Sequence, residues 1–433
     1  MEPVTLGVLS VGVLLAAILA SRIPVGFAMA VTGLGGYAAA MGPAAAWSML
    51  GGEVWEVFSS YGLTVIPFFI FMGQICFYSG VNERLYRAVY AWMGHIRGGI
   101  AYATVLACAG FSAICGSNTA TAATMSAVAL PEMKKYGYAP VLSTGCVAAG
   151  ATLGVLIPPS VVLIVIGLQT GLSISTLFMA GIMPGLLLTG LFLAVVWLLC
   201  RRHPQWGPAG EKSSWRSRMR ALPGAGEILI LFVLVIGGLF MGVFTPTEAG
   251  AAGSAIALLL SLAGRRLSLR GLVDAVNDTL RISSMIMVII LGAVLYGRFL
   301  AVTRLPFAVA EWTASLPLPP LGILLLICGV YIVGGMMMDA LALLLVTIPI
   351  FFPVVQAMGY DPVWFSVFIT VITTMGAITP PVGVTAFVVA SAAGDVGVQD
   401  VFRGVTFFLA AYAVCALLLL LVPQIVLFIP SLM

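Results

Sequence analysis

The sequence predicts an all-α polytopic membrane protein made of two inverted repeats, and three observations lead to this fold class. Of its 433 residues, 61% are hydrophobic and only 8% are charged, whereas a soluble domain carries roughly 25% charged residues. Apolar stretches that reach the length of a spanning helix, about 20 residues, recur along the whole chain. Matches at one constant spacing relate the two halves. The composition excludes soluble enzymes, nucleic-acid-binding proteins and secreted disulfide-rich scaffolds.

Hydropathy predicts five crossings in each half. They cover 4–21, 23–41, 63–80, 141–170 and 174–200 in the first half, and 227–244, 248–264, 282–300, 362–392 and 404–423 in the second. The polar, Pro/Gly-rich range 201–226 predicts a basic cytoplasmic linker between a first repeat, 1–200, and a second repeat, 227–433. The range 268–281 is amphipathic and predicts a segment on the membrane surface. Thr245 and Glu248 have the spacing of a capping box at a helix start.

Two further apolar regions, 98–131 and 319–354, are too long for one helix and are interrupted at their middle. The interruptions are Cys115-Gly-Ser-Asn-Thr119 and Gly334-Gly-Met-Met-Met-Asp339. Each region predicts a re-entrant helical hairpin that turns inside the membrane. Irregular backbone at that depth is tolerated only where protein or a cavity surrounds it.

The basic residues support this layout through the positive-inside rule. With the N-terminus outside, 17 of the 19 lysines and arginines fall on the cytoplasmic side, from Arg22 through Arg281 to Arg403. Only Arg298 and Arg304 fall outside. Because each half has an odd number of crossings, the C-terminus is also predicted outside and the second repeat is inverted relative to the first.

An internal repeat relates the two halves at an offset of 380 − 158 = 222, which maps Pro158-Pro159 onto Pro380-Pro381. The same offset maps Pro24 to Pro246, Pro131 to Pro353, Gly137-Tyr138 to Gly359-Tyr360, Pro140 to Pro362 and Gly154 to Gly376. Inverted repeats with broken helices are typical of secondary transporters, which bind their substrate near the midplane where the repeats meet.

The turn of the first predicted hairpin, Gly116-Ser-Asn-Thr-Ala-Thr121, carries polar residues that suit a cation. Ser117, Asn118 and Thr119 supply neutral oxygens for Na⁺, and the helix after the turn offers N–H groups to a carboxylate. The alternative is a polar turn that only caps two half-helices. The offset pairs Ser117 with Asp339, the only acidic residue between Glu311 and Asp361. Asp339 can ligate a cation, cap the following half-helix, or do both.

The two proline pairs lie in Gly154-Val-Leu-Ile-Pro-Pro-Ser160 and Gly376-Ala-Ile-Thr-Pro-Pro-Val-Gly383. Adjacent prolines remove two N–H donors and break a helix. The carbonyls that they free are good ligands for a hard cation, and the half-helix after the break points its positive end at the gap. The alternative is a pair of packing kinks, which two repeat-related breaks opposite two polar hairpins disfavour.

Five segments in order resemble the large membrane subunit of TRAP transporters, the tripartite ATP-independent periplasmic uptake systems, over essentially the whole chain. They are GSNTATAATM, GVLIPPSVVLIVIG, FTPTEAGAAGS, MDALALLLVTIPIFFPVV and GAITPPVGVTAFVVAS. Ser117-Asn118-Thr119 is also similar to the hairpin signature of the wider ion-transporter superfamily, which includes sodium–dicarboxylate symporters. Many TRAP subunits have a turn richer in serine and glycine at this place.

The resemblance implies an elevator mechanism driven by Na⁺ as the coupling ion, with no other cofactor. It implies an organic acid as substrate, of the C4-dicarboxylate, sialic-acid or sugar-acid type. The implied sodium ligands are Ser117, Asn118, Thr119, Gly154, Pro158, Asp339, Gly376, Thr379 and Pro380. The implied substrate contacts, between the hairpin tips, are Ser117, Asn118, Thr121, Ser160, Asp339 and Thr385.

The implied partners are a small four-helix membrane subunit and a periplasmic substrate-binding protein, both separate polypeptides, in the inner membrane of a bacterium or an archaeon. The main alternative is a stand-alone sodium/dicarboxylate symporter of the same superfamily. An enzyme is not expected, because only two histidines occur and no CxxC pair or carboxylate cluster lies in the apolar segments. A passive channel is disfavoured because the breaks build a closed site rather than a continuous polar lining.

Overall fold

The computed structural model describes residues 3–20, 23–210, 212–394 and 396–433, and within these ranges it contains helices and no strand. Nine helices of the described ranges are long and apolar enough to cross a membrane, and five shorter helices are also apolar. These findings confirm an all-α fold with the composition of a polytopic membrane protein. Arg22, which the positive-inside rule assigns to the cytoplasmic side, lies outside the described residues.

The first half contains the following helices: α1 Pro3–Ala20, α2 Val25–Met41, α3 Pro43–Ser59, η1 Tyr61–Thr64, α4 Val65–Tyr78, α5 Val81–Met93, α6 Gly99–Cys115, α7 Asn118–Lys135, α8 Pro140–Ala151, α9 Leu153–Leu156, α10 Val161–Thr170, α11 Ile174–Arg202 and η2 Pro204–Trp206. The second half contains these: α12 Trp215–Phe240, α13 Pro246–Ala263, α14 Leu269–Val302, α15 Leu305–Ser315, α16 Pro320–Met337, α17 Ala340–Ala357, α18 Pro362–Gly376, α19 Val384–Ala393, α20 Val398–Leu421, α21 Gln424–Leu427 and η3 Pro430–Leu432. The breaks between α6 and α7, between α9 and α10 and between α18 and α19 fall at the predicted glycine- and proline-containing interruptions.

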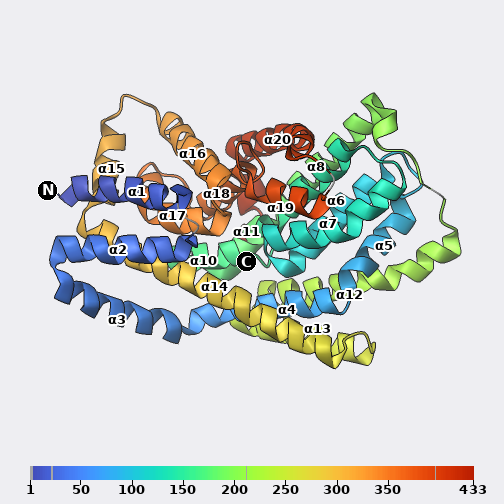
Figure 1. Ribbon diagram of the computed structural model, residues 1–433, viewed down its shortest axis with the longest axis horizontal. Helices are drawn as coiled ribbons and strands as arrows, with labels where there is room; N and C mark the ends of the chain where they lie inside the picture. Colours follow the sequence, from blue (N-terminus) through green and yellow to red (C-terminus); the bar gives the residue numbers. More distant parts are fainter. Residues whose placement is uncertain (1–2, 21–22, 211, 395) are drawn as a thin grey trace.

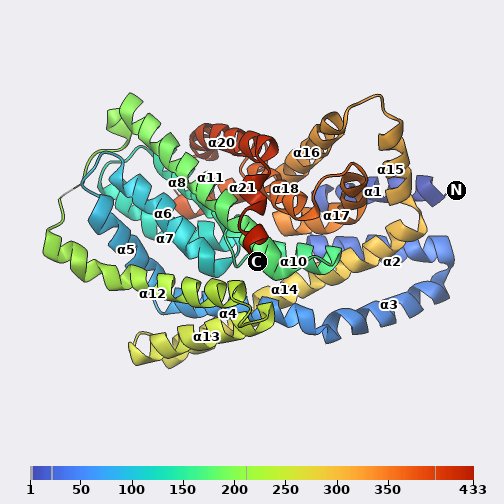
Figure 2. The same ribbon diagram turned by 180° about the vertical axis from the view of Figure 1, so that it is seen from behind.

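Helices at the offset of 222 have matching bounds and matching neighbours. The offset relates α7 to α17 at both ends, and it relates α10 to α19 with a shift of one residue. Helix α2 packs on α14 as α13 packs on α4, and α7 packs on α19 as α17 packs on α10. The pair α16–α17 lies toward the end of the long axis that carries the N-terminus, and the pair α6–α7 lies toward the opposite end (Figures 1 and 2).

The structure differs from the sequence prediction at three segments. The range 268–281 is not a separate surface segment but the first part of α14, because Ser268 caps that helix by accepting from Gly271 N at 3.0 Å and no proline follows. The linker is helical from Trp215 onward, since Ser214 caps α12 by accepting from Ser217 N. Helix α3, for which no crossing was predicted, follows α2 after a single residue, Gly42.

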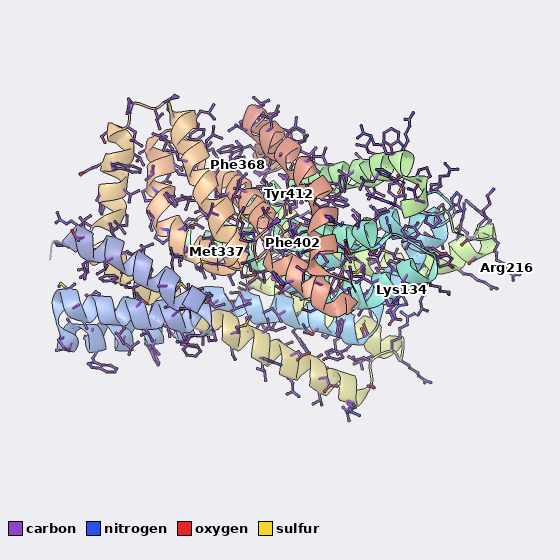
Figure 3. The ribbon with its side chains drawn as sticks, turned by 45° about the horizontal axis from the view of Figure 1, so that its top comes forward. Lys134, Arg216, Met337, Phe368, Phe402 and Tyr412 are labelled. Atoms are coloured by element: carbon purple, nitrogen blue, oxygen red, sulfur yellow. The ribbon has the colours of Figure 1, made fainter. Side chains whose placement is uncertain are left out.

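A scaffold of long helices runs along one side of the molecule (Figure 1). Helices α2 and α14 touch through backbone there: a Cβ added at Gly26 would lie 2.9 Å from Ile289 N, and one at Gly33 would lie 2.6 Å from Tyr296 N. Near its far end, Arg298 of α14 pairs with Glu53 of α3 at 2.5 Å. Figure 3 places Lys134 and Arg216 in the right-hand half of the molecule and Met337, the end of α16, in the left-hand half.

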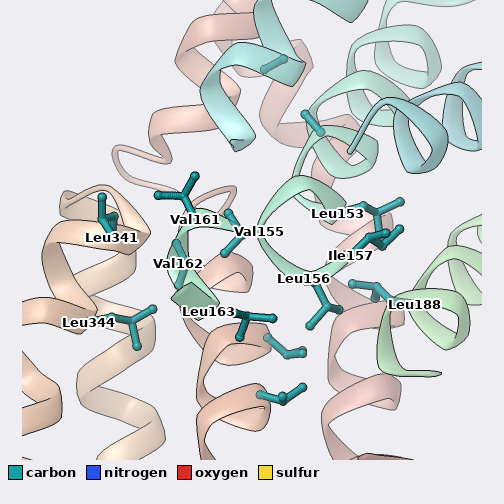
Figure 4. Close-up of a cluster of buried hydrophobic side chains, with 14 of the residues drawn as sticks. Leu153, Val155, Leu156, Ile157, Val161, Val162, Leu163, Leu188, Leu341 and Leu344 are labelled. Atoms are coloured by element: carbon teal, nitrogen blue, oxygen red, sulfur yellow. The ribbon is translucent and has the colours of Figure 1, made fainter. Parts of the chain in front are cut away.

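The first broken helix lies in the apolar core. Every residue from 151 to 160 is buried. Figure 4 shows Leu341 and Leu344 of α17 beside Val161 and Val162 of α10. These contacts hold the second half of one broken helix against the second arm of the other repeat's hairpin, and so fix the place where the irregular segments meet.

Candidate functional site

The turn between α6 and α7 is a compact polar tip. Helix α6 ends at Gly116, whose φ of 62° is left-handed and whose N–H donates to Ser112 O at 3.2 Å. Ser117 then caps α7 by accepting from Ala120 N at 3.5 Å, and its hydroxyl lies 3.2 Å from Thr119 Oγ1. The first N–H groups of α7 therefore point at the space in front of the tip.

This tip is packed directly on the first helix break. A Cβ added at Gly116 would lie 2.8 Å from Pro159 O, and one added at Gly154 would lie 3.0 Å from Ser117 O. With its amide oriented so that the nitrogen faces the end of α8, Asn118 donates to Thr152 O at 3.1 Å and to Ala151 O at 3.3 Å, the orientation that satisfies both amide atoms. The structure therefore brings together the first hairpin and the first broken helix.

One buried hydroxyl at this junction lacks a strong partner. Thr121 Oγ1 is fully buried and has no oxygen or nitrogen partner among the described residues, and its sulfur neighbour, the Cys115 thiol, is only a weak one. It lies beside Gly154, where an added Cβ would come within 3.2 Å of it and within 3.0 Å of Ser117 O. A buried unpaired oxygen is rare in folded proteins and calls for an explanation. A carbonyl and a hydroxyl converging on one point are the neutral oxygens that a hard cation takes.

The first break uses its own hydroxyl internally. Ser160 donates to Val155 O, a carbonyl freed by the proline pair, and accepts from Leu163 N at 3.4 Å as the cap of α10. Ser160 is fully buried. It therefore completes the break instead of facing the space between the hairpins.

The second hairpin tip lies between α16 and α17 and carries a carboxylate. Asp339 caps α17, and its Oδ2 accepts from Leu341 N at 3.1 Å. The residue as a whole stays accessible, and the hydrogen-bonded carboxylate is partly buried. The capping interpretation of Asp339 is therefore confirmed.

The second break is held by backbone contacts to the same hairpin. Gly383 N donates to Met336 O at 3.0 Å, and a Cβ added at Gly376 would lie 2.7 Å from Ile332 O. Thr379 donates its hydroxyl to Met375 O at 2.6 Å, one turn back. Pro380 is exposed. No side chain caps α19, which begins after Gly383 with a φ of 58°.

Both tips open on one cavity of about 1090 Å³, which is large enough for a small organic molecule. The first tip contributes residues 115–120, and the second contributes Asp339, Leu341 and Ala342. The opposite wall comes from α2, α4 and α14 of the scaffold. The N-terminal ends of α7 and α17 thus face one space, where their partial positive charges favour an anion.

The cavity gathers some of the residues implied by the resemblance and leaves others out. Ser117, Asn118, Thr119 and Asp339 line it. The other implied residues do not, and these are Thr121, Gly154, Pro158, Ser160, Gly376, Thr379, Pro380 and Thr385. Of these, Gly154 and Thr121 lie just behind the first tip.

Three polar residues of the scaffold wall were not anticipated as site residues. They are Gln74 of α4 and Arg281 and Ser284 of α14. The sequence counts Arg281 only as one of the cytoplasmic basic residues, and nothing in a single sequence separates it from the others. Its place in the cavity depends on tertiary packing of α14 beside α4.

Comparison with known proteins gives a family match over nearly the whole chain. The model of the DctM component of the tripartite ATP-independent periplasmic transporter matches residues 12–425. The C4-dicarboxylate TRAP transporter large permease protein DctM of Pseudomonas aeruginosa is 35% identical over 343 residues, which are 79% of this chain and 80% of the relative. The sialic acid TRAP transporter large permease protein SiaM of Vibrio cholerae is 32% identical over 389 residues, 90% and 89% of the two chains.

A likeness of fold extends to a more distant protein. The crystal structure of the YdaH transporter of Alcanivorax borkumensis superposes with a TM-score of 0.60 at 16% identity, over 88% of this chain and 89% of that chain. At this level of identity the likeness concerns the fold alone.

Proposed function

The chain belongs to the family of DctM components of tripartite ATP-independent periplasmic transporters. From this premise we propose that it imports an organic acid and that a sodium gradient drives the import. The family indicates that this multi-pass membrane protein is the large permease subunit of a transporter. Its relatives are transporter subunits rather than enzymes. The proposed substrate is a C4-dicarboxylate, a sialic acid or a sugar acid.

The observation that carries this proposal is the cavity that the two hairpin tips share. Two helix N-termini face it, and Asn118 and Ser117 place hydrogen-bonding groups on its wall. An organic acid binds best in a pocket with a positive electrostatic potential, and converging helix N-termini supply that potential.

Sodium coupling is supported by the junction behind the first tip. Ser117 O and Thr121 Oγ1, which has no oxygen or nitrogen partner among the described residues, converge beside Gly154. Thr121 is buried behind the tip, so this placement favours a sodium ligand over the substrate contact that the resemblance implied. At the second tip, the carboxylate of Asp339 can serve another sodium ion together with its capping role.

An elevator movement would carry the two hairpins and the two broken helices past the scaffold. The matched bounds and contacts of helices at the offset of 222 support two repeats, and the hairpins at opposite ends of the long axis support their inversion. In this arrangement the first hairpin enters the inner membrane from the cytoplasmic side. Both chain termini lie on the opposite, outer side of that membrane.

The partners in this proposal are a small four-helix membrane subunit and a periplasmic binding protein that delivers the acid. The alternative is a stand-alone symporter of similar fold, which would need no binding protein. Uptake of labelled succinate and N-acetylneuraminate into proteoliposomes separates the two. The vesicles hold this chain with its candidate small subunit, and are assayed with and without an inward Na⁺ gradient and the binding protein.

Uptake that needs both the gradient and the binding protein is the expected result. Sodium-driven uptake without the binding protein would favour the stand-alone symporter. Uptake that ignores the sodium gradient would contradict sodium coupling.

A further inference from the structure

Charge is scarce on the cavity wall, and the one cation there comes from the scaffold. Among the described residues that line the cavity, Arg281 and Asp339 alone carry charge. Asp339 belongs to the second hairpin tip, whereas Arg281 belongs to α14 on the opposite wall. An anionic substrate is repelled by the carboxylate and attracted by the guanidinium.

Arg281 has no carboxylate partner among the described residues, although its helix carries candidates. Asp278, one turn earlier on α14, accepts a hydrogen bond from Tyr78 of α4 at 2.6 Å. The contrast is Arg298 on the same helix, which pairs with Glu53 at 2.5 Å and approaches Glu56 at 3.9 Å. Arg298 is thus neutralised by acids of the protein, whereas Arg281 lines the cavity without one among the described residues.

Polar neighbours extend the surface around Arg281. Ser284 lies one turn further along α14, and Gln74 comes from α4, and both line the same cavity. Gly73, next to Gln74, touches the first tip, since a Cβ there would lie 3.3 Å from Ile114 O. The polar part of the scaffold wall therefore adjoins the tip that carries Ser117 and Asn118.

We propose that Arg281 binds a carboxylate of the transported acid from the scaffold side, with Gln74 and Ser284 as hydrogen-bonding neighbours. A guanidinium presents two parallel N–H groups to a carboxylate, a geometry that lysine lacks. This inference rests on the proposed function, because it assigns a residue to the organic acid named there.

The location of Arg281 gives it a role that no residue of the hairpins can have. Because α14 is locked to α2 by backbone contact at Gly26 and Gly33, Arg281 stays with the scaffold when the tips move. It therefore strengthens acid binding only while the tips stand against this wall, and Na⁺ sites behind the tips do not depend on it.

The test measures acid binding to the purified permease with its small subunit, as thermal stabilisation by succinate and by N-acetylneuraminate at saturating Na⁺. Arg281→Gln is expected to raise the apparent Kd for the stabilising acid about tenfold or more. Arg281→Lys is expected to weaken binding by a smaller factor. Arg270→Gln, a matched change of charge on the same helix outside the cavity wall, is expected to leave binding unchanged. Stabilisation by Na⁺ alone should be the same in all variants.

Each outcome decides a different point. Equal acid affinity in wild type and Arg281→Gln overturns the inference, as does equal weakening by Arg270→Gln, which would reveal a general effect of surface charge. If Arg281→Gln fails to insert, Arg281→Lys decides alone, and wild-type affinity in that variant overturns the inference. No stabilisation of the wild type by either acid counts against the proposed function itself.

Discussion

The two hairpin tips occupy equivalent places at the offset of 222 but use different chemistry. Ser117 caps α7 with a neutral hydroxyl, and Asp339 caps α17 with a carboxylate. Because serine and aspartate cap helices about equally well, capping alone does not require the charge at the second tip. The sodium sites proposed above would give the carboxylate of Asp339 a second task, which the first tip would meet with neutral oxygens.

The two helix breaks also differ in how far side chains complete them. The first break is buried, and Ser160 both caps α10 and binds the freed carbonyl of Val155. The second break exposes Pro380 and Pro381 and leaves α19 without a side-chain cap. The first half thus forms a site completed by side chains, whereas the second is held mainly by backbone contacts at Gly376 and Gly383.

The largest expected effect comes from breaking the neutral tip. Asn118→Leu removes the hydrogen bonds to Ala151 O and Thr152 O, so Thr152 O keeps only its long bond from Val155 N at 3.4 Å. Uptake should fall by about 100-fold or more while the protein still inserts, as measured by transport and by its level in the membrane. Asn277→Leu, on the exposed face of α14, is the matched control. Retained uptake in Asn118→Leu would contradict a role for the first tip.

The second change tests whether the carboxylate does more than cap. Asp339→Asn keeps a capping side chain but removes the charge, so the Na⁺ concentration for half-maximal uptake should rise about tenfold. Asp361→Asn is the matched control, because Asp361 caps α18 in the same way by accepting from Trp364 N at 2.8 Å. Unchanged sodium activation in Asp339→Asn would leave Asp339 as a cap only.

A pair of glycine substitutions compares the packing of the two breaks. Both added Cβ atoms would meet backbone, but the contact is closer at Gly376, 2.7 Å from Ile332 O, than at Gly154, 3.0 Å from Ser117 O. Gly376→Ala should lower the free energy of unfolding by about 1–3 kcal/mol, and Gly154→Ala by less, as followed by the thermal midpoint in detergent. Gly297→Ala serves as the control, because a Cβ added at Gly297 would meet no neighbouring atom within 4 Å. The reverse order would show that the first break is the tighter one.

The smallest expected effect belongs to a cap that lies away from both tips. Thr245 and Glu248 form a full capping box at the start of α13, as the sequence predicts. Thr245→Ala should cost about 1 kcal/mol of stability and leave sodium activation unchanged. A shift of sodium activation in this variant would mean that loss of any cap perturbs the site, which would weaken the interpretation of Asp339.

The sequence located the helix breaks well because their causes are local. Proline pairs remove N–H donors after α9 and α18, and Gly116 permits the left-handed turn that ends α6. The all-α fold and the family followed from composition and motifs. The extension of α14 through 268–281 could not be predicted as easily, since an amphipathic start can lie on a membrane or continue a spanning helix.

For the cavity, the sequence predicted the polar residues of the hairpin tips but not those of the scaffold wall. Ser117, Asn118 and Asp339 stand out because polar residues interrupt apolar runs. Arg281 and Gln74 do not stand out, because their contact with the cavity depends on how α14, α4 and the tips pack. Likewise, the burial of Ser160 and Thr385 is a property of tertiary structure that local motifs do not reveal.

The contact of α2 with α14 through Gly26 and Gly33 makes these two helices a fixed frame of reference for spectroscopy. Their backbones are too close to slide past each other without a clash. By contrast, the cavity faces of α7 and α14 are separated by open space. Spin labels on the outer surfaces of α2 and α14 should therefore report one unchanging distance during transport, while a label pair on α7 and α14 should report a distribution that sodium and substrate redistribute.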